Sequence, residues 1–252
     1  MDTLFLSGIT RKHNVLPEKD RYLLSIPALR DLKELDFSSP VTFFVGENGS
    51  GKSTLLEAIA VLCGFNPEGG TRNMNFSTLE THSELHKLLR PIRSAFRPSD
   101  GFFLRAESFY NVSSEIEALD EESTRFGLPL LSDSYGGKSL HRQSHGESFL
   151  SLVVHRFGGN GLYLLDEPEA ALSPSRQLSL LSLLHDLVKD GSQFLIATHS
   201  PILMAYPGAD ILLLGEEGIA RSAYEDTEHY LLTKTFLDNP HRMLRHLFKE
   251  ED

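Results

Sequence analysis

The sequence predicts an α/β fold in which helices flank the core of a mostly parallel sheet. Apolar runs at residues 41–45, 161–165 and 193–197 are typical of strands that are buried on both faces. Segments with the apolar spacing of helices separate these runs along the chain. Such an alternation of buried strands and helices favours a parallel sheet that is wrapped by helices.

Each element is expected from its own local signal. Aromatic and β-branched residues between turn formers indicate strands, and apolar residues at helical spacing indicate helices. Pro174 in the first turn and Gly191 beyond the last turn predict the bounds of the longest helix. In chain order we expect strands at 4–10, 22–29 and 41–45, a helix at 53–63, helical periodicity at 79–96, a strand at 101–107, a helix at 109–119, a flexible loop at 132–138, a helix at 144–157, a strand at 161–167, a helix at 174–189, and strands at 193–198 and 209–215.

Length and cysteine content predict an intracellular chain with a sizeable core. The 252 residues include one cysteine, Cys63, which excludes an intramolecular disulfide and fits a reducing compartment. No apolar run approaches the roughly 18 residues that a membrane-spanning helix needs. The N-terminal segment carries an acid at position 2 and too short an apolar stretch for a secretory signal. We therefore expect a cytoplasmic protein that does not itself insert into a membrane.

The net charge of −11 argues against non-specific DNA binding over the whole surface. Attraction to phosphates is the main contribution to such binding, so an acidic chain is a poor candidate. A local basic excess lies within residues 72–105, formed by Arg72, Lys87, Arg90, Arg93, Arg97 and Arg105. This segment leaves nucleic acid open as a partner, and a solvated helix face is the other interpretation.

The segment GENGSGKST at residues 46–54 matches the phosphate-binding pattern G-x-x-x-x-G-K-[ST]. Its glycines let backbone N–H groups curl around a triphosphate. Lys52 supplies a positive charge to the β- and γ-phosphates, and the Ser53 hydroxyl suits Mg²⁺. A buried strand before the loop and a helix after it supply the required context. The candidate nucleotide-binding residues are Gly46, Glu47, Asn48, Gly49, Ser50, Gly51, Lys52, Ser53 and Thr54.

Two further strands end in residues that suit hydrolysis. The run LYLLDE ends in Asp166, which is placed to hold Mg²⁺, and in Glu167, which is placed to polarise the attacking water. Burying this carboxylate pair demands a cation or a proton. His199 follows the run QFLIAT, where it can hydrogen-bond the γ-phosphate. The bland alternatives are a pair of solvated turn carboxylates and a structural histidine.

Taken in order, these segments resemble the ABC-type ATPases. The phosphate loop is followed by SHGE at 144–147, by LLDEPEAALSP at 164–174 and by THSP at 198–201. The SHGE run is similar to the signature motif of that family, usually written LSGGQ or LSGGE. The resemblance spans almost the whole chain, so it implies one ATPase domain at 1–252 with a helical lid and signature insert at about 66–157.

The resemblance also implies a mechanism in which two subunits enclose two ATP molecules. Ser144 and Gly146 would contact the γ-phosphate held by the other subunit, because a hydroxyl and backbone N–H groups at a helix N-terminus attract anions. Glu107 would stand in for the glutamine that senses metal and water. Two positions depart from the family pattern: Ser173 replaces an aspartate that couples the subunits, and His145 replaces the first glycine of the signature.

We therefore expect a Mg²⁺-dependent ATPase that acts as an ATP-gated homodimeric switch for a separate effector protein or for nucleic acid. A partner-activated or non-catalytic ATP-binding module is the first alternative. The ATPase subunit of a membrane transporter is the second. The wording DEPEAALSP and THSP argues against it, because it resembles the soluble, stand-alone ATPases of chromosome maintenance, repair and phage defence, whereas transporter domains more often read DEPTSALD.

Overall fold

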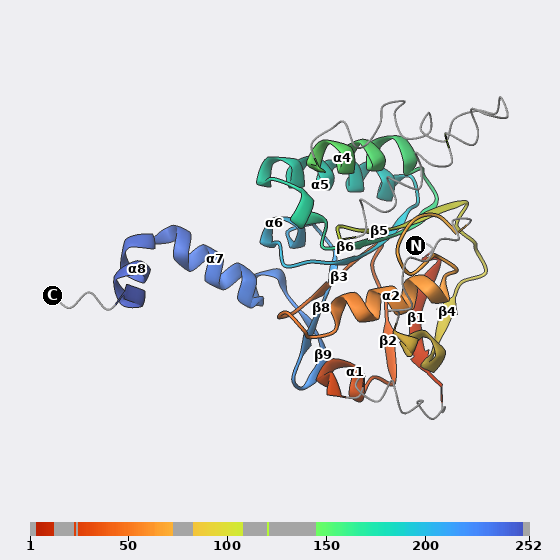
Figure 1. The fold of residues 1–252 in the computed structure, drawn as a ribbon, viewed down its shortest axis with the longest axis horizontal. Helices are drawn as coiled ribbons and strands as arrows, with labels where there is room; N and C mark the ends of the chain where they lie inside the picture. The colour runs from red at the N-terminus through yellow and green to blue at the C-terminus, as the bar shows by residue number, and fades with distance from the viewer. Residues whose placement is uncertain are drawn as a thin grey trace.

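A computed structural model describes residues 4–12, 23, 25–72, 83–107, 120 and 145–248. Its main sheet has the strand order β5-β6-β7-β3-β8-β9, and all neighbours run parallel except β8 and β9 (Figure 1). These strands are β3 (Val41–Val45), β5 (Asp100–Arg105), β6 (Gly161–Asp166), β7 (Gln193–Ala197), β8 (Asp210–Gly215) and β9 (Gly218–Ser222). The sequence thus predicted the α/β class correctly.

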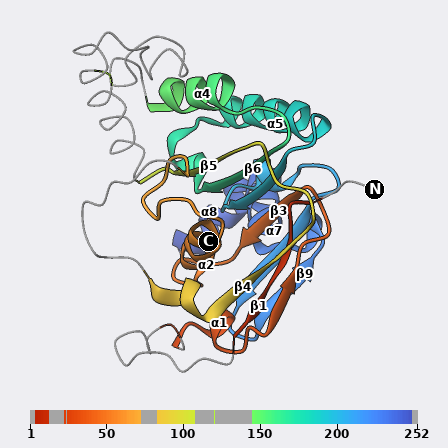
Figure 2. The ribbon, with the colours of Figure 1, turned by 90° about the vertical axis from the view of Figure 1, so that its right-hand side faces the viewer.

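Helices cover both faces of this sheet. Successive residues of a strand point to opposite faces, so each strand contributes side chains to two cores. Phe44 of β3 belongs to the core shared with helix α2 (Lys52–Leu62). Phe43 belongs to the core on the other face, with helices α4 (His145–Arg156) and α5 (Pro174–Lys189). Figure 2 shows α4 and α5 on one side of the sheet and α2 on the other.

A smaller antiparallel sheet lies against the α2 side of the molecule. Its order is β2-β1-β4, with β1 at Leu6–Arg11, β2 at Glu34–Asp36 and β4 at Leu89–Arg93. Helix α1 (Pro27–Arg30) connects β1 to β2, and a 3₁₀ helix at Glu84–Leu88 leads into β4. Leu6 and Ile9 of β1 join the core that contains α2.

Two expectations about secondary structure are wrong. The strand expected at 22–29 is replaced at its end by helix α1, because Pro27 occupies the first helical turn, where its fixed φ is favourable. The helical periodicity expected at 79–96 ends in strand β4, whose Pro91 is tolerated because β4 is an edge strand. The expected helix at 109–119 and loop at 132–138 lie outside the described residues.

The expected helical insert at 66–157 is therefore only partly helical. Its described residues 83–107 contribute strands to both sheets, and α4 forms its end. Residues 108–144, apart from Asp120, are outside the described part of the chain. A helical lid across that stretch stays a prediction.

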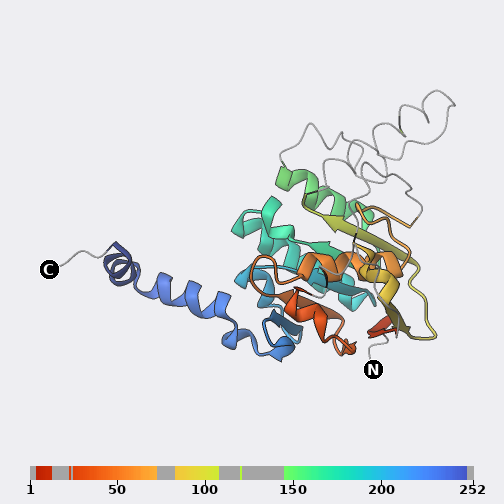
Figure 3. The same ribbon diagram turned by 60° about the horizontal axis from the view of Figure 1, so that its bottom comes forward.

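The C-terminal helices form an arm that extends away from the body of the molecule (Figure 3). Helix α7 (Glu228–Asp238) and helix α8 (Pro240–Phe248) bury none of their residues. A 3₁₀ helix at Pro168–Ala171 and the short helix α6 (Pro201–Met204) complete the described elements near the ends of β6 and β7. Within the described ranges, no helix has the length and apolar character needed to cross a membrane.

Candidate active site

The carboxyl ends of β3, β6 and β7 meet at one edge of the main sheet. Strand β7 lies between the other two, with Phe44 and Asp166 both paired to Ala197. The three segments predicted to bind or hydrolyse a nucleotide directly follow these strands. Open α/β sheets bind ligands at such an edge, so the topology brings the predicted segments together.

The phosphate loop is shaped by glycines with positive φ. Gly46 has φ 155° and Gly51 has φ 97°. A Cβ atom at Gly46 would lie 2.3 Å from the Leu214 carbonyl oxygen, and one at Gly51 would lie 2.8 Å from Ile26 Cγ2. Both positions therefore require glycine. Of the other loop residues, Glu47, Asn48 and Gly49 are exposed, whereas Ser50, Ser53 and Thr54 are half-buried.

Lys52 begins helix α2 and is 4% exposed. Its Nζ donates hydrogen bonds to the carbonyl oxygens of Gly46 (2.8 Å) and Glu47 (3.0 Å), which hold the ammonium over the loop. Burial lowers the Lys52 pKa, and the charges of Glu167 and Asp166 oppose that effect. Phosphate oxygens of a bound nucleotide could therefore replace these two carbonyl oxygens as acceptors of the Lys52 hydrogen bonds.

Asp166 and Ser53 form a pair that fits a divalent cation. The Asp166 side chain is 6% exposed, and burial raises its pKa to about 6 against the charge of Arg105 and a hydrogen bond from Ser53. Among the described residues, no group hydrogen-bonds Asp166 Oδ1. A buried carboxylate with an unused oxygen beside a hydroxyl suits Mg²⁺, which prefers oxygen ligands and takes few from the protein. This fit supports the assignment of Ser53 and Asp166 as metal ligands. The assignment stays a prediction.

Arg105, at the end of β5, is a site residue that the sequence did not reveal. Its Nε lies 3.4 Å from Asp166 Oδ2, and its Nη1 donates to Glu57 Oε2 at 2.9 Å. Glu107, the predicted metal-sensing residue, is 86% exposed and meets Arg105 Nη2 at 3.8 Å. Arg105 therefore contacts all three carboxylates, and a metal-sensing role for Glu107 stays a prediction.

Glu167 adopts the left-handed conformation, φ 50° and ψ 51°, which is uncommon for a residue other than glycine. Its N–H donates to the Ala197 carbonyl at 2.9 Å, so the turn is fixed to the end of β7. The side chain is 38% exposed, in contrast to Asp166. This environment suits a group that handles water.

His199 faces Glu167 across the site. The distance from His199 Nε2 to Glu167 Oε1 is 3.7 Å, and that nitrogen is buried without a hydrogen-bond partner in the described part of the chain. Burial lowers the His199 pKa, Lys52 and His229 lower it further, and Glu167 opposes them. A neutral imidazole at this place can donate one hydrogen bond to an anion.

Glu169 holds the backbone of His199 in place, and the sequence did not reveal this contact. Its Oε1 accepts the backbone N–H of His199 at 2.5 Å, and its carboxylate also accepts a hydrogen bond from Thr198. Burial raises the pKa of Glu169. The second glutamate of the sequence DEPEAALSP is therefore a scaffold for the loop that carries His199.

The predicted signature segment is only partly described. Ser144 lies outside the described residues, and Gly146 is buried in the first turn of α4. A Cβ atom at Gly146 would lie 2.4 Å from Arg176 Nη1 and 2.7 Å from the Ala171 carbonyl oxygen. Close packing within this chain thus explains the glycine, and contact with the phosphate of a second subunit stays a prediction.

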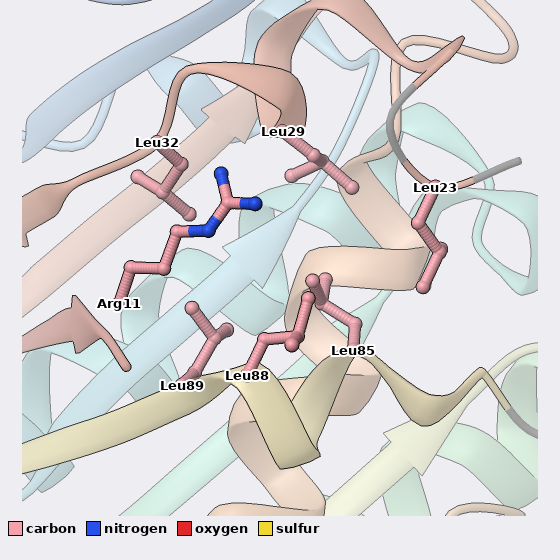
Figure 4. A pocket seen from close by; sticks show the side chains of 7 residues that line it. All are labelled: Arg11, Leu23, Leu29, Leu32, Leu85, Leu88 and Leu89. Atoms are coloured by element: carbon pink, nitrogen blue, oxygen red, sulfur yellow. The ribbon is translucent and has the colours of Figure 1, made fainter. Parts of the chain in front are cut away.

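A small cavity among β1, α1 and β4 is too small for any part of a nucleotide. Its volume is about 10 Å³, which is roughly the room needed for one water molecule. Figure 4 shows Arg11 among the leucines that line it, and Arg11 Nη1 donates to the Arg30 carbonyl oxygen at 2.7 Å. The lining residues are Arg11, Leu23, Leu29, Leu32, Leu85, Leu88 and Leu89.

A phosphate loop at the edge of a parallel sheet, with Asp166 at the end of β6 on the other side of β7, defines a P-loop nucleoside triphosphatase. Family models agree: one described as "AAA domain" matches residues 23–123, and one described as "AAA domain, putative AbiEii toxin, Type IV TA system" matches 139–205. A protein of Caldanaerobacter subterraneus subsp. tengcongensis named "Putative ABC transporter ATP-binding protein" is 31% identical over 214 residues, 78% of this chain and 84% of that one. The chain belongs to the ABC-type ATPases, and it is an ATPase.

Two further similarities are with proteins that carry the name CbiO. The cobalt import ATP-binding protein CbiO of Salmonella typhimurium is 27% identical over 237 residues, 86% of each chain. The solved structure of cbiO1 from Clostridium perfringens, part of the ABC transporter complex cbiONQ, covers 98% of this chain and 100% of that one at 19% identity and a TM-score of 0.48.

Proposed function

We propose that this chain is the ATP-hydrolysing subunit of a larger machine, which closes as a homodimer on MgATP and thereby drives a separate partner. The proposal treats residues 1–252 as one ATPase domain that acts in the cytoplasm. Its main support is one arrangement: Lys52, Asp166 and His199 meet at the ends of neighbouring strands. Within the described residues, this arrangement leaves Ser50 Oγ, Asp166 Oδ1 and His199 Nε2 buried and unpaired. Buried polar atoms without partners are costly, so a polar ligand at this place has a physical reason.

Each residue has a role that follows from its environment. Lys52 and the loop N–H groups would bind the β- and γ-phosphates, and Ser53 and Asp166 would hold Mg²⁺, which neutralises phosphate charge. Glu167, at the more exposed position, would accept the proton of the attacking water. His199 would donate from Nε2 to the γ-phosphate. The remaining loop residues Gly46, Glu47, Asn48, Gly49, Ser50, Gly51 and Thr54 would shape the phosphate cradle.

A second copy of the chain would complete the site. Gly146 of the partner subunit lies in the first turn of helix α4, and a helix N-terminus attracts anions. Ser144 of the partner subunit, two residues earlier in the sequence, would add its hydroxyl. Glu107 would sense the metal through Arg105, which its carboxylate meets. ATP would then join the two subunits, and hydrolysis would release them.

The first candidate partner is a membrane-embedded transport component. Curated relatives of this chain carry the names of ABC transporter and cobalt import ATP-binding proteins. This finding favours the transporter alternative over the stand-alone switch that the sequence wording DEPEAALSP suggests. In this role the chain would couple ATP-driven closure to a separate membrane protein.

The second candidate partner is an effector that is not in a membrane. The match of residues 139–205 to a family model named for a toxin–antitoxin system supports it. That segment includes helix α4, strand β6, which ends in Asp166, and strand β7, which precedes His199. Nucleic acid is a further partner of this kind, at the basic residues within 72–105.

The experiment that tests catalysis is Glu167→Gln, with the exposed Glu217→Gln as the matched control. The Glu167→Gln protein should bind ATP with little loss and lose about 10²- to 10⁴-fold in turnover, and it should accumulate as an ATP-bound dimer in gel filtration. Wild-type turnover in Glu167→Gln, or a strictly monomeric chain with ATP, would contradict the proposal.

The same trapped variant identifies the partner. Affinity-tagged Glu167→Gln is isolated with ATP from detergent-solubilised membranes and, separately, from the soluble fraction. A membrane protein retained with ATP and lost without it supports the transport role. ATP-dependent retention of a soluble protein or of nucleic acid alone supports the second candidate.

A further inference from the structure

Helix α7 of the C-terminal arm begins beside the catalytic histidine of the proposed function. Its second residue, His229, has Nε2 3.1 Å from His199 Nδ1, and the two ring centroids are 5.3 Å apart at an angle of 51°. His229 therefore contacts Nδ1 of His199. The other ring nitrogen of His199, Nε2, lies 3.7 Å from Glu167 Oε1.

The start of α7 is fixed to the His199 loop by other contacts as well. The Tyr224 hydroxyl donates to the Pro201 carbonyl oxygen at 2.9 Å. Thr227, which is fully buried, caps α7: its hydroxyl donates to the Tyr224 carbonyl at 2.7 Å and accepts from the Tyr230 N–H at 3.3 Å. A capping contact of this kind stabilises the start of a helix. The position of His229 beside His199 is therefore built into the fold.

Hydrogen-bond chemistry indicates which nitrogen carries the proton. A neutral imidazole has one N–H and one acceptor nitrogen, and the hydrogen bond at one nitrogen determines the state of the other. Glu167 and a γ-phosphate are acceptors only, so His199 needs its proton on Nε2. Its Nδ1 is then an acceptor, which is satisfied when His229 Nε2–H donates.

We propose that His229 is a positioning residue that fixes His199 in its Nε2–H tautomer, with that N–H directed at the reacting phosphate. This inference rests on the proposed function, in which His199 touches the γ-phosphate. Without His229, His199 Nδ1 could take the proton instead, and its Nε2 would then present a lone pair to an anion. His229, at the start of the C-terminal arm, would thereby determine whether His199 can donate a hydrogen bond to the γ-phosphate.

The test uses the 252-residue chain with ¹⁵N-labelled histidine. Long-range ¹H–¹⁵N correlation spectra report the tautomer of each ring, and the His199 signals are assigned by their loss in His199→Gln. We expect the Nε2–H tautomer of His199 in the wild type, a mixture of tautomers in His229→Ala, and the Nε2–H tautomer again in His229→Gln, whose amide N–H can donate at a similar reach. His241→Ala, on the exposed face of α8, is the control and should leave the spectrum of His199 unchanged.

Steady-state kinetics give the second readout. His229→Ala should lower kcat about 10- to 100-fold, the range found when a partner that orients a metal-bound histidine is removed, and KM for ATP should change by less than about threefold. His229→Gln should recover most of the lost turnover. A structural role alone would not produce a kcat loss that Gln repairs.

The two proposals fail in distinguishable ways. A His199 tautomer that is unchanged in His229→Ala overturns the positioning role, whatever the ATPase rate. Equal kcat in wild type and His229→Ala also overturns it. A wild-type chain that hydrolyses no ATP, while the tautomer responds as expected, instead overturns the proposed function and with it the catalytic meaning of the contact.

Discussion

Arg105 and Asp166 face one another across β5 and β6, with Arg105 Nε 3.4 Å from Asp166 Oδ2. The guanidinium is nevertheless shared, because its Nη1 also pairs with Glu57 at 2.9 Å. The effect of burial on the Asp166 pKa therefore exceeds the opposing effect of the Arg105 charge, and the pKa is raised. The metal-binding carboxylate of the proposed site is thus held in a costly state until a cation arrives, which leads to the first prediction.

Asp166→Asn should stabilise the protein in the absence of nucleotide and Mg²⁺ while abolishing hydrolysis. The pKa of Asp166 rises from an ordinary value of 3.8 to about 6, so at neutral pH its ionised form costs the fold about 3 kcal/mol. A raised carboxyl pKa means that this cost is absent below about pH 4, grows as the pH rises to about 6, and stays constant above.

Urea denaturation of both proteins at several pH values measures this effect. The stability advantage of Asp166→Asn should be small near pH 4 and full above pH 6. Asp186→Asn, an exposed substitution on α5, is the matched control and should show no such trend. A variant that is less stable than the wild type at neutral pH would contradict the prediction.

The phosphate loop, the strand that ends in Asp166 and Glu167, and His199 could be predicted from the sequence because each has a local signal. Helix α5 was predicted with its exact bounds, since Pro174 and Gly191 mark its ends. Arg105, Glu169 and His229 could not be predicted in this way. Their roles arise from contacts between segments far apart in the chain, such as that between Glu169 and the His199 N–H.

The two glutamates of DEPE should respond differently to removal of their charge. Glu167→Gln removes the proposed base, so turnover should fall about 10²- to 10⁴-fold. Glu169→Gln keeps an oxygen that can accept the His199 N–H, so turnover should fall less than about tenfold. Glu169→Ala removes that acceptor from two buried donors and should cost about 1–3 kcal/mol of stability. Phosphate release at saturating ATP and urea denaturation decide these points, and a larger kinetic loss in Glu169→Gln would assign the base to Glu169 instead.

Tyr163 stabilises the sheet far from the proposed chemistry. Its buried hydroxyl lies 2.7 Å from Asp100 Oδ2 and accepts the Gly158 N–H at 2.7 Å, while its ring stacks on Phe157. Tyr163→Phe keeps the stacking but leaves the Gly158 N–H unpaired, so we expect a loss of about 1–3 kcal/mol and unchanged ATP turnover. Chemical denaturation at neutral pH measures the loss, and a wild-type stability in Tyr163→Phe would refute this role.

Acid should erase part of that stabilisation. Burial raises the pKa of Asp100, but hydrogen bonds from Tyr163 and Arg156 outweigh it and hold the pKa below its ordinary value. A lowered carboxyl pKa means that the stabilisation is present above the unfolded-state pKa and is lost as the pH falls through the folded-state pKa. The stability difference between wild type and Tyr163→Phe should therefore shrink below about pH 4.

The sequence did not predict β4 because its pairing is not local. Strand β4 lies beside β1, with Pro91 opposite Ile9, and contact with that distant partner overrides the helical spacing of residues 79–96. The C-terminal arm is a second case. The sequence does not predict helices α7 and α8, which bury no residue in this chain.

Two glycines of the phosphate loop should fail for different reasons when replaced by alanine. Gly51 has φ 97° and packs so closely on Ile26 that a Cβ would lie 2.8 Å from its Cγ2, so Gly51→Ala should destabilise the protein itself. Gly49 has φ 81° but no atom within 4 Å of such a Cβ, so Gly49→Ala should cost only the backbone strain, about 1 kcal/mol. The open space beside Gly49 is where we expect phosphate oxygens to approach, so Gly49→Ala should bind ATP at least about tenfold more weakly. Thermal denaturation without nucleotide and ATP titration separate the two effects, and normal ATP affinity in Gly49→Ala would show that the nucleotide does not approach this part of the loop.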